Sequence, residues 1–105
     1  MNDSFYDRES QFEAKFAHDE ELKFKILAHR SRLFAAWVAD QMGESAPPDY
    51  ADGFVAFALG RSAEALIEQA RSDLHDHGIA LADTKLAKAF EQAASQAETE
   101  VIGAA

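Results

Sequence analysis

The chain has 105 residues, 28% of them charged, and a formal net charge of −9. This length corresponds to one domain with a modest single core. Such an acidic chain is repelled by nucleic acid, whose binders carry clustered basic surfaces, so we expect no DNA or RNA partner. The lack of cysteine excludes disulfides and thiolate metal sites.

No apolar run suits a signal peptide, and none approaches the roughly 18 apolar residues that a membrane span requires. We therefore expect a cytoplasmic protein without direct membrane insertion.

The first part of the chain combines large aromatic residues with dense charge of both signs. At 100° per residue, Phe5, Phe12 and Phe16 fall within about 40° of one another on a helix. A narrow aromatic stripe on a charged segment suits a helix that docks in a groove of another protein, although a helix packing on its own bundle would look the same. The charged or titratable neighbours are Asp7, Arg8, Glu9, Glu13, Lys15 and His18.

Residues 20–42 form the first strongly periodic stretch. Apolar residues recur there at i, i+3 and i+4, which predicts a helix, and Gly43 is a typical C-terminal stop. The predicted apolar stripe consists of Leu22, Ile26, Leu27, Leu33, Phe34, Trp37 and Val38.

A turn containing Pro47 and Pro48 leads into a second, short helix that ends near Gly60. Its expected buried face is Tyr50, Phe54, Phe57 and Ala58.

Two further helices follow in the last third of the chain. Ser62 is a suitable N-cap for the third helix, and Gly78 ends it, with Ile79 placed to make the apolar contact that accompanies such an end. The fourth helix begins near Asp83 or Thr84. The predicted inward residues of these two helices are Ala63, Leu66, Ile67, Ala70, Leu74, Leu86, Phe90, Ala93, Ala97 and Val101.

Four helices joined by short connections predict an all-α fold, a small four-helix bundle with a mobile or partly helical N-terminal arm. We divide the chain into the arm, residues 1–18, and the bundle, residues 19–105. A segment of about 18 residues is only marginally helical alone in water. We expect the arm to continue the first helix when it is bound.

The sequence contains no recognisable catalytic motif. The glycines are isolated, no serine lies in a nucleophile motif, and helical hairpins of this size leave little room for a deep cleft. His75 and His77 lie about 200° apart on a helix, so they cannot share a metal ion. We therefore expect a non-enzymatic protein without a metal site.

Three residues are candidates for an anionic ligand. Lys23 and Arg30 fall within the angular range of the first helix's apolar stripe, and Tyr50 could stack on a purine. The two cations admit three interpretations: their stems line the core while their heads reach water, they meet a carboxylate such as Asp73, or they hold the phosphate of a nucleotide.

The residues of the first third resemble a known family, the alpha-proteobacterial zeta subunit that inhibits the F-type ATP synthase. The resemblance covers nearly the whole chain. It is carried by Phe5-x-Asp7-Arg8-Glu9, by Phe12-Glu13-x-Lys15-Phe16-Ala17-His18-Asp19, by Glu21-Leu22-x-Phe24-Lys25, and by Trp37, Met42-Gly43, Tyr50-Ala51 and Arg71-x-Asp73.

This resemblance implies an inhibitor whose N-terminal helix enters the catalytic head of the synthase and blocks ATP hydrolysis beside the central stalk. It also implies a location at the cytoplasmic face of the inner membrane, and we expect a monomer. Adenine nucleotide, ATP or ADP, has been associated with the bundle of the family and is the one regulatory ligand we consider. The alternatives are a nucleotide-binding helical regulator and a synthase-associated protein that does not inhibit.

Overall fold

The computed structural model describes the backbone of residues 2–104 and the side chains of residues 19–104. Within residues 2–104 the chain is helical and contains no strand. The all-α fold with four main helices is thereby confirmed. The elements are α1 (Asn2–Met42), the short 3₁₀ helix η1 (Gly43–Ser45), α2 (Tyr50–Ala58), α3 (Ala63–Asp76) and α4 (Asp83–Ala104).

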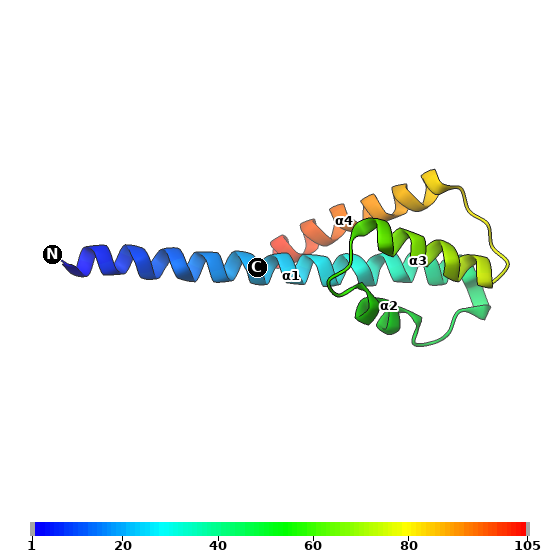
Figure 1. Cartoon of the computed structure of the whole chain (residues 1–105), viewed down its shortest axis with the longest axis horizontal. Coiled ribbons are helices and arrows are strands. Elements are labelled where there is room, and N and C mark those ends of the chain that lie inside the picture. Colours follow the sequence, from blue (N-terminus) through cyan, green and yellow to red (C-terminus); the bar gives the residue numbers. More distant parts are fainter. Residues whose placement is uncertain (1, 105) are drawn as a thin grey trace.

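Helix α1 organises the molecule, which measures 68 × 26 × 23 Å. Helices α2, α3 and α4 gather around its C-terminal half, whereas its N-terminal half projects beyond them as a single rod (Figure 1). The backbone of residues 2–18 is therefore helical and continuous with the rest of α1. Continuity of the arm with the first helix in the bound state stays a prediction.

The helix ends follow from local chemistry. The Ser62 side chain accepts a hydrogen bond from the backbone N–H of Ala65, as its predicted N-cap role requires. Gly78 adopts a positive φ of 76°, which costs glycine little, and the N–H of Ile79 donates to the carbonyl of Leu74 at 2.9 Å. Gly43, at φ 64°, also has a positive φ and directly follows the last residue of α1.

The core is centred on Phe34 of α1, which is fully buried. Its ring meets Phe54 of α2 edge-on at 5.8 Å and Phe90 of α4 edge-on at 5.1 Å, and it stacks with Trp37 at 6.2 Å. Edge-to-face pairs of this kind stabilise beyond the area that they bury. One side chain thus joins three helices.

The predicted stripe of residues 20–42 is right near its C-terminal end and wrong at Leu27. Phe34 and Val38 are buried, but Leu27 is 48% exposed. The reason is that α2 ends at Ala58 and leaves the surface around Leu27 uncovered. Periodicity marks a helical face, but it does not show how far along that face the covering helices reach.

Among residues 2–104, no helix combines the length and the apolar character needed to cross a membrane.

Candidate functional site

The first candidate site is the arm, residues 1–18. The predicted partner-binding side chains, Phe5, Asp7, Arg8, Glu9, Phe12, Glu13, Lys15, Phe16 and His18, lie outside the side chains that the structure describes. The backbone that carries them is helical. The three phenylalanines can form the predicted stripe only on a helical backbone, and the backbone here is helical.

The candidate nucleotide-binding residues, by contrast, lie at three separate places. Lys23 is largely exposed and pairs with Glu20 at 3.5 Å along the same helix. Arg30 lines a hollow between α1 and α2, and Tyr50 lines another beside α3. The structure does not bring the three side chains together around one ligand.

Tyr50 belongs to a small polar cluster on the outside of the core. Its hydroxyl donates to Oδ2 of Asp73 at 2.7 Å, and the Gln69 amide donates to Oδ1 of Asp73 at 2.8 Å. Burial, followed by the hydrogen bond and the charge of Asp73, raises the pKa of Tyr50 well above its ordinary value. Asp49 lines the same hollow as Asp73, so the hollow carries negative charge. This charge disfavours the binding of a phosphate.

Asp73 therefore holds Tyr50 and Gln69 rather than Lys23 or Arg30. The Arg30 guanidinium lies over the ring of Phe90, 4.7 Å from its centroid. Its Nε is buried without a hydrogen-bond partner among the described residues, and burial lowers the pKa of this guanidinium. A cation–π contact of this kind partly replaces lost hydration.

A groove between α1 and α2 escaped the sequence analysis. We call it the α1–α2 groove; its main lining residues are Phe24, Leu27, Arg30, Val55, Leu59 and Arg61. Phe24 is 60% exposed and Leu59 61% exposed, both large values for apolar side chains. The sequence signal was Phe24, which lies three residues before Leu27 on one helical face.

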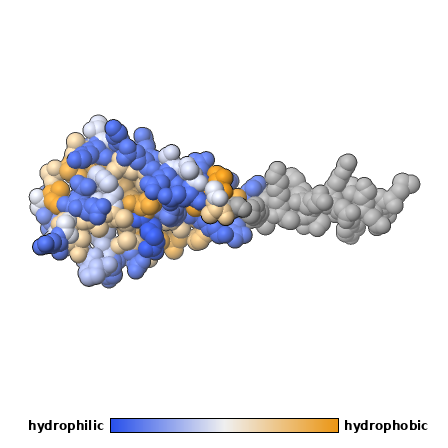
Figure 2. All heavy atoms as spheres, turned by 180° about the vertical axis from the view of Figure 1, so that it is seen from behind, coloured by the Kyte–Doolittle hydropathy of each residue, from blue (hydrophilic) through white to orange (hydrophobic). Residues whose placement is uncertain are grey.

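Figure 2 shows one face of the molecule with polar and apolar atoms interspersed over the bundle and an apolar cluster near the base of the arm. The fourth exposed large apolar residue among the described side chains, Ile102, lines a separate hollow with Leu22 and Ile26.

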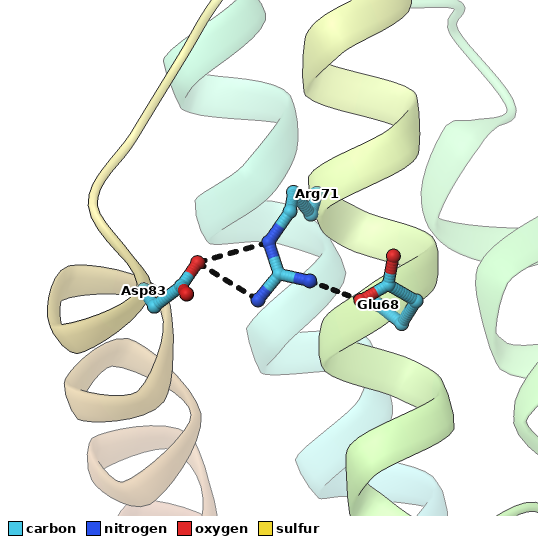
Figure 3. A network of polar contacts seen from close by, with 3 residues as sticks. All are labelled: Glu68, Arg71 and Asp83. Atoms are coloured by element: carbon cyan, nitrogen blue, oxygen red, sulfur yellow. Dashed lines mark hydrogen bonds and ion pairs between the residues drawn. The ribbon is translucent and has the colours of Figure 1, made fainter.

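The polar contacts between helices elsewhere have structural roles. In Figure 3, Arg71 of α3 donates through Nε and Nη2 to Oδ1 of Asp83, at 3.0 and 2.9 Å, and through Nη1 to Glu68. This network ties α3 to the first turn of α4. Arg71 and Asp73, paired in the sequence motif, thus serve different partners.

The His75-Asp76-His77 stretch lies at the end of α3. His77 is the C-cap, and its Nδ1 lies 3.0 Å from Oγ of Ser45 in η1. Over the described residues, no three His, Asp or Glu side chains are grouped so that they could hold a metal ion.

The fold is an all-α bundle with one helix that projects beyond it and an apolar groove near the base of the projecting part. The family model described as ATPase inhibitor subunit zeta matches residues 1–100. The chain therefore belongs to the zeta family of ATPase inhibitor subunits, as its resemblance predicted. This membership implies association with ATP synthase. Searches of curated proteins and of solved structures gave no match.

Proposed function

We propose that this protein inhibits ATP hydrolysis by the F-type ATP synthase by inserting its arm, residues 1–18, at a catalytic interface beside the central stalk. The family match supports the target. In this proposal a monomer acts at the cytoplasmic face of the inner membrane, and the protein itself catalyses no reaction.

The observation that carries the proposal is the continuity of α1. Its helix runs without a break from the buried Phe34 into the arm. Seventeen helical residues, 2–18, span about 25 Å at 1.5 Å per residue, enough to reach between two subunits. The bundle is wider than a helix, so it limits how far the arm can enter.

The aromatic residues set the scale of the binding energy. Burying Phe5, Phe12 and Phe16 contributes about 1.5–3 kcal/mol each. Losses of side-chain and rigid-body freedom offset much of this sum. The three rings alone then give weak binding, with a Kd of about 1 μM at best.

Tight inhibition requires further contacts. In this proposal charge-assisted hydrogen bonds supply them. The side chains that bind the partner are Asp7, Arg8, Glu9, Glu13, Lys15 and His18. Rotation of the stalk in the hydrolytic direction traps the arm.

The test compares three forms of the protein on ATPase-active membranes from its own source. These are the natural chain, a chain lacking residues 1–18, and a chain whose residues 1–18 are rearranged so that the three phenylalanines lie on different faces of the helix. We expect only the first to inhibit, because the rearranged arm keeps the composition and charge but loses the aromatic stripe. All three should keep the same thermal midpoint.

Undiminished inhibition by the truncated chain would contradict the role of the arm. Binding to the synthase without any inhibition would instead identify the non-inhibitory associated protein that we considered as an alternative.

The second candidate function is regulation by ATP or ADP. The observation that favours it is the half-buried guanidinium of Arg30, whose Nε has no hydrogen-bond partner among the described residues. Titration with ADP while amide shifts are recorded tests this proposal; shifts should appear around Arg30. If no amide moves at millimolar nucleotide, the candidate is refuted.

A further inference from the structure

We infer that the α1–α2 groove is a second docking surface, which takes an acidic amphipathic helical segment of the same synthase that the arm enters. The inference rests on the proposed function. The occupant offers an apolar anchor residue to the groove and a carboxylate to the two arginines at its edge. Helices commonly bind in apolar grooves of this kind.

The apolar part of the surface is concentrated. Of the four large apolar residues that are strongly exposed among residues 19–104, Phe24, Leu27 and Leu59 all line this one groove. They come from α1 and from the turn after α2. Contiguous exposed apolar surface with a polar rim is typical of interaction sites.

The charge of the groove is complementary to a carboxylate. Within residues 19–104, no acidic side chain pairs with Arg30 or Arg61, whereas Lys25 pairs with Glu21 and Arg32 with Asp52 at 3.1 Å. Arg61 instead donates through Nε to the carbonyl of Phe57 and lies 4.1 Å from the centroid of that ring. Both guanidinium groups therefore retain donors for an anionic partner.

The position along α1 links the groove to the arm. Phe24 lies six residues beyond residue 18, about 9 Å along the helix axis. The part of the synthase that holds the arm would therefore lie next to the groove. Because both surfaces share one helix, the second contact fixes the rotation of the arm and raises the overall affinity without requiring tighter binding by the arm itself.

Other occupants fit less well. A second copy carries the same charge of −9, so two copies repel each other at long range. A small anion would pair with the arginines but leave Phe24 and Leu59 exposed. A partner segment with both chemistries covers the whole groove.

The experiment uses the full chain and ATPase-active membranes from its own source. Leu59→Ser tests the apolar part of the groove and Arg61→Glu its charge. The matched controls are Ile102→Ser, at a similarly exposed apolar residue, and Lys88→Glu, at an exposed cation on α4. Concentration for half-inhibition, maximal inhibition and thermal midpoint are measured for each.

We expect each groove variant to raise the half-inhibitory concentration about tenfold, as loss of a central contact residue does. Maximal inhibition should be unchanged, because the arm is intact. The controls should match the natural chain, and thermal midpoints should agree across the set, which separates loss of docking from loss of fold.

If the natural chain does not inhibit, the proposed function and this inference both fail. If it inhibits and the groove variants match the controls, only the groove is refuted. Dimers in sedimentation that Leu59→Ser dissolves would assign the groove to self-association. Amide shifts of the groove residues with ADP alone, absent in Arg61→Glu, would assign it to a nucleotide; either result overturns the inference.

Discussion

The two halves of α1 share one backbone but differ in what surrounds them. In the C-terminal half, Phe34, Ala35 and Val38 have no exposed surface. From residue 19 to Arg30 no side chain is buried, and Lys23 and Lys25 pair only with acids of their own helix. The difference shows that one helix can form part of the core at one end and expose its side chains to solvent at the other.

The consequence concerns where stability is located. Surface pairs at i, i+3 and i, i+4 contribute only about 0.2–0.5 kcal/mol each, whereas the packing around Phe34 joins three helices. Changes in the N-terminal half should therefore affect binding, and changes in the C-terminal half should affect folding.

The sharpest test substitutes one phenylalanine in each half. Phe34→Ala should lower the free energy of unfolding by about 3–5 kcal/mol, because it leaves a cavity between three helices. Phe12→Ala should leave it within about 0.5 kcal/mol and weaken inhibition instead. Urea unfolding, followed by circular dichroism, measures the first effect, and ATPase assays the second.

If Phe12→Ala lowers the free energy of unfolding as much as Phe34→Ala does, the two halves of α1 do not differ in this way. The arm would then pack on its own domain, the alternative that the sequence left open.

A smaller effect is expected from weakening the helix itself. Ala36, exposed in the packed half, and Ala17, in the arm, allow a matched pair of substitutions to glycine. Ala36→Gly should cost about 1 kcal/mol in global stability, the difference in helix propensity between the two residues. Ala17→Gly should not change global unfolding but should lower helical content and inhibition, because a less helical arm must be ordered on binding.

Circular dichroism at low temperature measures the helical content, and the midpoints of urea unfolding measure the global stability. Equal losses of global stability in the two variants would show that the arm folds cooperatively with the bundle.

Much of the fold was predictable because its signals are local. The Ser62 cap, the Gly78 stop and the apolar spacing of α3 and α4 each depend on residues within one or two turns. The burial of Ser31 was not predictable in this way. Its hydroxyl donates to the carbonyl of Leu27 at 3.0 Å, which lets a polar side chain lie at a core position.

The candidate sites were harder to predict, because they depend on how helices meet. Sequence angles placed Lys23 and Arg30 on one face, but Arg30 packs over the ring of Phe90, whereas Lys23 is largely exposed and pairs with Glu20 of its own helix. The groove depends on where α2 ends and on Leu59 in the turn that follows. Such positions follow from the packing of distant segments, which periodicity within one helix does not report.

The smallest effect concerns the boundary between the two halves, where Glu100 of α4 contacts His29 of α1. Hydrogen bonds from Gln96 and then from His29 hold the pKa of Glu100 below its ordinary value of 4.5. A lowered pKa favours the folded state above the unfolded value, and this contribution is lost as the pH falls through the folded value. Thermal midpoints of the natural chain and of Glu100→Gln should therefore differ at pH 6 and converge as the pH falls below the lowered pKa of Glu100, where the carboxylate is protonated in both states. Glu98→Gln, at an exposed acid of the same helix, should show no such convergence; if it does, the effect reflects net charge and not the contact between α1 and α4.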